Sequence, residues 1–346
     1  LIPCNDFSYY DHVLDTSIMV NAIPERYFPV IENRANTELD LYFAMARGYQ
    51  KEGLDITAME MTKWYDTNYH YIVPEFTKNQ KFSFFSEQVL KEFYEAKEAL
   101  KQTPKVVLLG PVSYLLSGKE KEEGFHRIEL LDRLLLVYET ILTKLENYGA
   151  NWIQFDEPCL VTILNDNERK AVATTYEFLR RKFPFLKLML ATYFDCTGEN
   201  IEVAVNLQID VLHVDLVRCP SQLDDLLDST FKKATTTLSL GLVDGRNIWK
   251  NDYKKSLSFI HKAVEVLGES RVMIAPSCSL LHVPIDLDLE KKLNHQIKNW
   301  LAFAKQKLHE LLDLKTIAGG IEAGDAIEKF RENQNAIQSR RESTLI

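Results

Sequence analysis

The sequence predicts an α/β protein, specifically a (β/α)8 barrel that lacks its first strand. Short apolar runs rich in branched residues alternate with amphipathic helical stretches, which is typical of a parallel sheet. No glycine-rich phosphate-binding turn occurs, although a doubly wound sheet would normally carry one. Polar residues instead stand at the ends of the apolar runs, where a barrel builds its site from the C-terminal ends of its strands.

Seven such runs are predicted to form parallel strands buried on both faces. They lie at residues 1–6, 106–114, 152–158, 188–195, 211–217, 237–245 and 272–280. A complete barrel has eight strands. One strand is therefore absent or lies within residues 55–76.

The stretches between the runs carry apolar residues at three- and four-residue spacing, which predicts helices. Residues 128–149 and 256–268 each end at a glycine that can adopt the left-handed conformation after a helix. Residues 289–320 predict one long amphipathic helix that ends at a pair of glycines. A short helix and a polar tail are predicted after it.

Composition argues against several classes of partner. The 346 residues are 46% hydrophobic, and 41 basic against 50 acidic residues give a net charge of −9. No basic stripe is present that would bind nucleic acid or an anionic membrane surface. No run approaches the roughly 20 apolar residues that a membrane span needs. We therefore expect neither a nucleic acid nor a membrane as partner.

The five cysteines lack CxxC spacing, and their odd number argues against a disulfide framework. This pattern predicts a reducing, cytoplasmic location. The chain opens directly as a buried strand at Leu1, without a leading loop. We interpret it as a piece of a longer protein.

The run EMTKWYDTNYHYIVPEF at residues 60–76 places Lys63 among aromatic rings and acids. Two interpretations remain open from the residues alone. Lys63 is either a cation that binds a ligand or an ordinary lysine whose aliphatic stem lies on an aromatic surface.

Several strand ends carry groups that could perform chemistry. Asp156 and Glu157 form an adjacent pair that could act as general acid and base, or could bind neighbouring backbone amides. His213 and Asp215 alternate on one strand and so face the same side, which would suit a metal or proton site. A hydrogen-bonded interior histidine is the ordinary alternative.

Cys278, in the run PSCSLLH, could be a nucleophile or a metal ligand, with His282 close in sequence. Buried cysteines more often behave as small apolar residues. The run GLVDGRNIW at residues 241–249 has the glycines and the Asp-Gly turn that a loop over a barrel mouth would use.

Six runs in this order resemble the N-terminal half of the cobalamin-independent methionine synthase family. They are YDHVLDTS, EMTKWYDTNYHYIVPEF, VLLGPVSYL, QFDEP, GLVDGRN and SCSLLHVPIDL. The resemblance extends over the whole chain, to IQSRREST near its C-terminus.

The resemblance implies an enzyme that transfers the methyl group of 5-methyltetrahydropteroyltriglutamate to homocysteine and so makes methionine. It implies two face-to-face (β/α)8 barrels, with zinc and catalysis in the C-terminal one. Residues 1–346 would then be the N-terminal barrel domain, truncated at its start, with the C-terminal zinc-bearing barrel absent. The chain alone is expected to be inactive and to have that barrel as a partner.

The duplicated barrels also imply where a zinc site would lie in this half. The four corresponding positions are Tyr193, Asp195, Asp215 and Cys278. Zinc sites favour nitrogen and sulfur ligands, so a tyrosine, two aspartates and one cysteine form a poor set. We expect no catalytic residue and no metal or other cofactor in this chain.

The resemblance assigns Lys63 to the polyglutamate tail of the folate, where a flexible ammonium suits several carboxylates. Trp64, Tyr69 and His70 are expected to pack and to support it. Two alternatives remain: a free-standing barrel enzyme that uses Asp156 and Glu157, and a non-catalytic interaction module. The exposed edges of an incomplete barrel also predict self-association, or a local segment that covers the gap.

Overall fold

The computed structural model describes residues 1–33, 35–51, 53–229, 231, 234–320 and 324–345. The chain divides into two compact units. The first comprises Leu1–Ala191 with Leu207–Ile209, and the second comprises Thr192–Asn206 with Asp210–Ile346. Each is described by itself.

Four parallel strands form the centre of the first unit, in the order β1-β7-β9-β10. They are β1 (Pro3–Cys4), β7 (Lys105–Leu109), β9 (Trp152–Asp156) and β10 (Lys187–Ala191). β1 is shorter than predicted because Asn5 adopts a left-handed conformation, with φ of 63°, that turns the chain out of the strand. β7 is also shorter, since Pro111 begins a helix two residues after Leu109.

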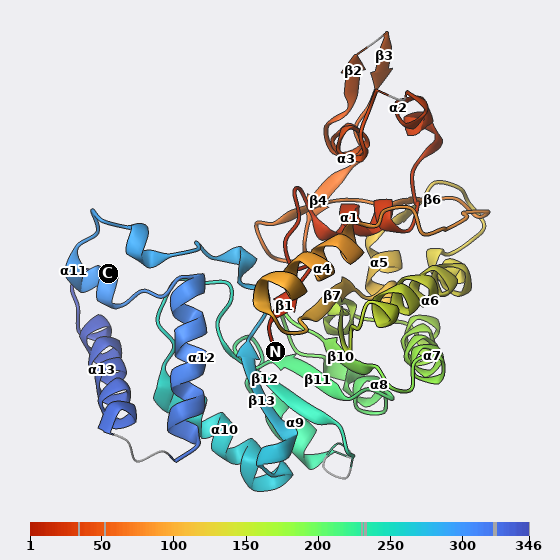
Figure 1. Ribbon diagram of the computed structural model, residues 1–346. Helices are drawn as coiled ribbons and strands as arrows, with labels where there is room; N and C mark the ends of the chain where they lie inside the picture. The colour runs from red at the N-terminus through yellow and green to blue at the C-terminus, as the bar shows by residue number, and fades with distance from the viewer. Residues whose placement is uncertain (34, 52, 230, 232–233, 321–323, 346) are drawn as a thin grey trace. The chain divides into compact units, whose positions relative to one another are not determined.

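Most helices of the first unit flank these strands, whereas α2 and α3 lie apart from them, and α5, α6 and α7 pack beside one another (Figure 1). Their bounds are α1 (His12–Met19), α2 (Phe28–Glu32), α3 (Glu38–Arg47), α4 (Gln88–Leu100), α5 (Pro111–Ser117), α6 (Leu131–Asn147) and α7 (Asp166–Lys182). Short 3-10 turns lie at Glu25–Tyr27, Arg127–Leu130 and Pro158–Val161. α6 ends just before Gly149, whose φ of 90° is the left-handed conformation that the sequence predicted.

Residues 49–51 and 53–76, as far as the structure describes them, add no further strand to the β1-β7-β9-β10 set. They form two antiparallel pairs, β2 (Tyr49–Lys51) with β3 (Leu54–Ile56) and β4 (Met61–Lys63) with β5 (His70–Ile72). β6 (Glu75–Phe76) pairs with β8 (Lys119–Glu120).

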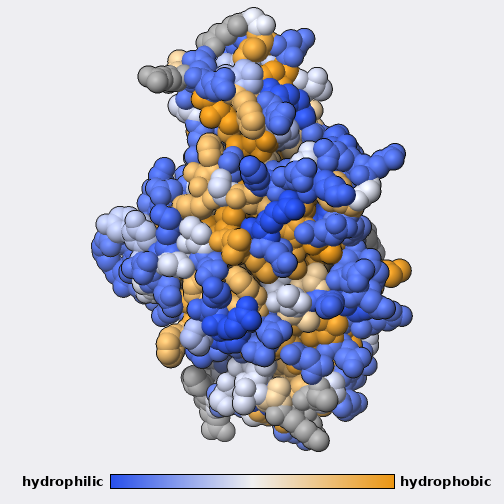
Figure 2. Space-filling view, turned by 90° about the vertical axis from the view of Figure 1, so that its right-hand side faces the viewer, coloured by the Kyte–Doolittle hydropathy of each residue, from blue (hydrophilic) through white to orange (hydrophobic). Residues whose placement is uncertain are grey.

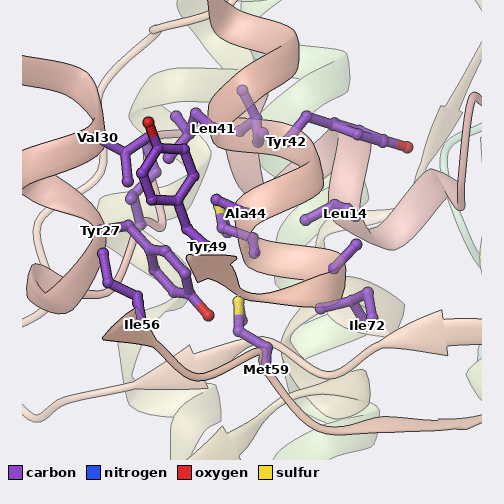
Figure 3. Close-up of a cluster of buried hydrophobic side chains, with 14 residues drawn as sticks. Leu14, Tyr27, Val30, Leu41, Tyr42, Ala44, Tyr49, Ile56, Met59 and Ile72 are labelled. Carbon is purple, nitrogen blue, oxygen red and sulfur yellow. The ribbon is translucent and has the colours of Figure 1, made fainter. Parts of the chain in front are cut away.

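A hydrophobic cluster underlies this part of the first unit (Figure 3). It joins side chains of α1, α2 and α3 to those of the β2–β5 segment. Labelled members are Leu14, Tyr27, Val30, Leu41, Tyr42, Ala44, Tyr49, Ile56, Met59 and Ile72. Burial of this much apolar surface holds the base of the β4–β5 hairpin on the unit.

The second unit contains three parallel strands in the order β11-β12-β13. They are β11 (Val211–Asp215), β12 (Thr237–Val243) and β13 (Val272–Pro276). The helices are α8 (Ile201–Val205), α9 (Gln222–Asp228), α10 (Tyr253–Leu267), α11 (His295–Asn299), α12 (Ala304–Ala318) and α13 (Gly324–Arg341), with 3-10 turns at Gly198–Asn200, Glu269–Arg271, Leu280–His282 and Leu287–Leu289. With the four strands above, this confirms the predicted α/β class and its seven parallel strands.

The single long helix predicted over residues 289–320 is wrong. The chain forms α11, leaves the helical conformation, and begins α12 only at Ala304. Leu301 pairs with Trp249 in an antiparallel bridge, and Leu301 and Phe303 are buried in a small apolar cluster with Leu287. Apolar spacing alone could not distinguish this docked segment from a helical face.

None of the described helices combines the length and apolar character that crossing a membrane would require. Figure 2 shows hydrophilic residues over much of one face, with hydrophobic residues reaching the surface in separate areas between them. Such a mixture is ordinary for a protein surface.

Candidate functional site

Lys63 lies at the end of β4, directly opposite His70 of β5. Its side chain is exposed, and it forms no ion pair with any residue that the structure describes. The Lys63 ammonium also makes no cation–π contact with an aromatic ring of the described residues. Lys63 thus presents an exposed ammonium that has no ion pair and no cation–π contact among the described residues.

Trp64, the next residue, anchors the hairpin. Its side chain is only 2% exposed. Its ring meets His12 of α1 edge-on, with centroids 4.5 Å apart, and meets Tyr71 of β5 edge-on at 5.3 Å. Edge-to-face aromatic pairs at such distances are favourable, so Trp64 fixes the backbone from which Lys63 projects.

The turn that follows Trp64 is closed by hydrogen bonds. The Trp64 N–H donates to the Tyr69 carbonyl at 2.8 Å, and the Thr67 hydroxyl donates to the Trp64 carbonyl at 2.6 Å. Tyr65 adopts a φ of 53°, which is rare for an aromatic residue and persists only where the surrounding contacts hold it. Both observations indicate a rigid turn beside Lys63.

Asp11 ties the other strand of the hairpin to α1. One carboxylate oxygen accepts the Leu14 N–H at 2.7 Å as the N-cap of α1, and the other accepts the Ile72 N–H of β5 at 2.9 Å. Desolvation by complete burial raises the pKa of Asp11 to about 7. Asp11 is therefore a structural link between helix and hairpin.

The acids near Lys63 in the sequence have other partners. Glu60 pairs with Lys119 at 2.6 Å, and Glu75 forms a two-point pair with Arg26 at 2.7 Å for each bond. Asp55 accepts a hydrogen bond from Gln50. These carboxylates therefore do not neutralise the ammonium of Lys63.

The structure does not bring Asp156 and Glu157 together as an acid–base pair. Glu157 is completely buried, and its carboxylate accepts the N–H groups of Val112 at 3.3 Å and Ser113 at 2.7 Å, at the start of α5. Asp156 instead accepts a hydrogen bond from Gln154 at 2.7 Å. Desolvation raises the pKa of Glu157 to about 7, which reflects its burial beneath a helix end.

His213 in the second unit is a hydrogen-bonded interior residue. Its ring nitrogens lie 3.0 Å from the Ser239 hydroxyl and 3.3 Å from the Ser277 carbonyl. Asp215 is also buried, and accepts the N–H groups of Phe194, Val217 and Arg218 at 2.9–3.2 Å. Because these amides occupy both of its oxygens, Asp215 is poorly disposed to bind a metal.

The other three positions implied for a zinc site differ in environment. Tyr193 is buried with its ring against Phe194, whereas Asp195 is exposed and accepts the N–H of Cys196. The Cys278 thiol is buried, and desolvation followed by the charge of Asp215 raises its pKa far above the ordinary value. Among the described residues, no three histidine, cysteine or acidic side chains lie together in a way that could hold a metal ion.

His282 does not share a site with Cys278 through a hydrogen bond in the described structure. Its ring packs against Phe194, with centroids 5.6 Å apart, and burial lowers its pKa to about 4. The loop of residues 241–249 does approach Cys278. A Cβ atom on Gly245 would lie 2.8 Å from the Cys278 sulfur, so only glycine fits there.

The cysteine pattern argued against a disulfide framework, but the structure contains one disulfide. Cys196 and Cys219 are joined by a disulfide, with their Cα atoms 5.1 Å apart. Cys4, Cys159 and Cys278 remain free. The pair was missed because its members are 23 residues apart and lack a spacing motif, although each follows the end of a predicted strand.

The sequence also gave no sign of a cavity of about 490 Å³ in the first unit. It lies beside α1 and the first turns of α3 and α4, with Asp15, Glu38 and Glu92 among its polar lining. Burial raises the pKa of Asp15 to about 6. His12 lies between this cavity and the β4–β5 hairpin: it is one of the residues that line the cavity, and its ring contacts Trp64.

Comparison with known proteins agrees with the motifs around Lys63. The family model described as cobalamin-independent synthase, N-terminal domain, matches residues 1–268. The chain belongs to this family. Its match to the cobalamin-independent synthase domain covers the β4–β5 hairpin and, in the second unit, β11 and β12.

Curated relatives in this family are closely similar and considerably longer. A 5-methyltetrahydropteroyltriglutamate–homocysteine methyltransferase from Cytophaga hutchinsonii is 59% identical over 349 residues, which is 100% of this chain and 45% of that protein. The proteins of the same name from Flavobacterium johnsoniae and Salinibacter ruber are 56% and 46% identical, again over 100% of this chain and 45% of theirs. The chain thus spans less than half the length of these relatives and corresponds to their N-terminal part.

Proposed function

We propose that this chain is the N-terminal part of an enzyme that transfers the methyl group of 5-methyltetrahydropteroyltriglutamate to homocysteine. The activity is that of its longer relatives, which carry this name. We propose that the present chain contributes the support of the fold and a contact for the glutamyl tail. Its partner is then the remainder of the enzyme.

Lys63 is the residue proposed to contact the tail. The supporting observation is that its ammonium is exposed and lacks an ionic partner among the described residues, while Trp64 and Asp11 hold the hairpin beneath it. A glutamyl tail carries several carboxylates, and a lysine on a fixed backbone can neutralise one without a fixed hydrogen-bond geometry. An exposed pair of this kind contributes about 0.5–1 kcal/mol, or two- to fivefold in affinity.

No step of the transfer is assigned to this chain. We propose that Asp215 and Cys278 do not hold zinc, because the Asp215 carboxylate already accepts hydrogen bonds from three backbone amides and the Cys278 side chain is buried. Zinc would be supplied in the remainder of the enzyme, where it would activate the homocysteine thiol. We propose that the 346-residue chain alone does not turn over, and that it works in the cytoplasm.

The test compares folates that differ only in tail length. Calorimetry at low ionic strength should show tighter binding of the triglutamate than of the monoglutamate to the chain. Lys63→Ala should lose two- to fivefold in triglutamate affinity, with Lys63→Arg closer to the parent. Lys170→Ala is a matched control, since Lys170 is also exposed and lacks an ion pair within the described part of the chain.

Equal affinities of the parent and Lys63→Ala for the triglutamate would refute the assignment of Lys63. Turnover by this chain with homocysteine, zinc and the triglutamate would refute the proposal that it lacks catalysis. Binding of a separately produced remainder of the enzyme, without any binding of the triglutamate, would favour the interaction module.

Self-association through strand edges remains a prediction. β1 and β13 each end the strand order of their own unit. An unpaired edge presents backbone groups that another strand can bind. Sedimentation equilibrium over a range of concentrations will measure whether the chain pairs with a second copy.

A further inference from the structure

The segment after β10 and the segment after β11 are joined by a covalent bond within the second unit. Cys196 lies in the first segment, five residues after Ala191, and Cys219 lies in the second, four residues after Asp215. Their disulfide closes a loop with a sequence separation of 23 residues. Cys196 is half-buried, whereas Cys219 is only 2% exposed.

Non-covalent contacts hold the same two segments together. The Phe194 N–H donates to the Asp215 carboxylate at 3.2 Å, and the Arg218 guanidinium donates to the Phe194 carbonyl at 3.3 Å. The Thr197 hydroxyl bonds to Gln222, whose amide donates to the Asp215 carbonyl at 2.8 Å. These bonds do not depend on the sulfurs, so two thiols formed by reduction would stay close enough to join again.

We propose that Cys196 and Cys219 form a reversible dithiol–disulfide pair that a dithiol reductant opens in the folded protein. A thiolate of the reductant attacks the Cys196 sulfur, because that sulfur belongs to the more exposed residue. The bond between the two cysteines breaks, and Cys219 leaves as a thiolate that takes a proton from water. The second thiolate of the reductant then attacks the mixed disulfide and releases Cys196, which is protonated in turn.

Electrons and protons balance in this thiol–disulfide exchange. The protein disulfide gains two electrons and two protons, and the reductant becomes a cyclic disulfide. A disulfide oxidant reverses the reaction by the same two attacks.

The Cys196–Cys219 disulfide also lies close to a residue with an uncommon backbone conformation. Phe194 adopts a φ of 85°, a left-handed conformation that is costly for an aromatic residue. It is two residues before Cys196, and the Arg246 guanidinium lies 5.0 Å from its ring. Opening the bond removes one of the constraints that hold this conformation, so residues 193–200 and 216–222 become more mobile when the pair is reduced.

Thiol labelling of the folded parent chain is the direct test. The chain is oxidised with diamide, treated with or without dithiothreitol, labelled with N-ethylmaleimide without denaturant, and analysed by peptide mass spectrometry. We expect an adduct on the half-buried Cys196 only after reduction, and its loss after renewed oxidation. Cys219 is buried and should be labelled after reduction only to the extent that residues 216–222 become mobile. The other cysteines should label slowly, because they are buried and a raised pKa keeps their thiols protonated.

Two further measurements test the consequence for the segments. Reduction should lower the Tm by about 5 °C or more, as expected for loss of a cross-link that closes a loop of this length. Amide exchange should rise in residues 193–200 and 216–222 while β12 stays protected. The double variant C196S/C219S should match the reduced parent and show no redox dependence, whereas Cys4→Ser should keep the full redox-dependent shift.

Three results would overturn the proposal. Labelling of Cys196 and Cys219 after diamide alone would show that the bond does not form. Protection of both residues after dithiothreitol, or loss of the circular dichroism signal on reduction, would show a permanent structural cross-link. Equal exchange of the two segments in both states would show that the bond does not control them.

Discussion

Glu157 provides the most quantitative prediction from this structure. Its carboxyl group is completely buried and receives hydrogen bonds from the Val112 and Ser113 amides at the start of α5. Burial nonetheless dominates and raises its pKa from 4.5 to about 7. The perturbation is Glu157→Gln, which keeps the shape and an accepting oxygen but removes the titration.

Proton linkage gives the sign and the size of the change in the free energy of unfolding with pH. Between about pH 4.5 and pH 7 the folded chain keeps the Glu157 proton while the unfolded chain loses it. The folded state therefore binds more protons in this window, and the free energy of unfolding falls as pH rises through it. At 1.36 kcal/mol for each pKa unit, the fall attributable to Glu157 is about 3 kcal/mol.

Urea unfolding at several pH values between 4 and 8, followed by far-UV circular dichroism, measures this fall. The free energy of the parent minus that of Glu157→Gln should decrease by about 3 kcal/mol across the window. Glu177→Gln, at an exposed position on α7, should show no such trend. If the difference between the parent and Glu157→Gln is constant with pH, the reasoning about burial is wrong.

Two further substitutions test the packing around the site. Trp64→Ala should lower the free energy of unfolding by about 3–5 kcal/mol, as for other large-to-small changes in a core, and should also weaken triglutamate binding; a loss below about 1 kcal/mol would show that Trp64 does not anchor the hairpin. Gly110→Ala would place a Cβ atom 2.5 Å from Cγ of Glu157, so urea unfolding should show a loss of about 1–3 kcal/mol. An unchanged stability would mean that Glu157 can move away from α5.

The parts of the fold that the sequence predicted correctly are those with a strong local signal. Each of the seven apolar runs overlaps one of the seven parallel strands, and Gly149 and Gly268 follow α6 and α10 with positive φ as expected. Strand ends were less accurate, because Asn5 and Pro111 end their strands through backbone conformation rather than through hydropathy. The predicted long helix failed because Leu301 is buried in a bridge to Trp249, far away in the sequence.

In the candidate site, too, the sequence indicated individual residues but not their partners. Patterns of residues singled out Lys63, Asp156, Glu157 and Asp215, and the family motifs selected Lys63 among them. They could not show that Glu157 is bonded to α5, or that the acids near Lys63 pair with Lys119 and Arg26. Those partners are distant in the chain, so no local pattern contains them.

The amino-acid sequence by itself determined the α/β class, the seven strands and the family. Apolar runs that alternate with amphipathic stretches, and the residues of long motifs, are local properties of the chain. Only the tertiary structure decided that Lys63 is exposed without an ionic partner in the described residues, that Asp215 is bonded to three amides, and that Cys196 meets Cys219. Each of these depends on which distant groups folding brings within a few ångströms. Burial and hydrogen bonding at those short distances then set the charge state and chemistry of each side chain.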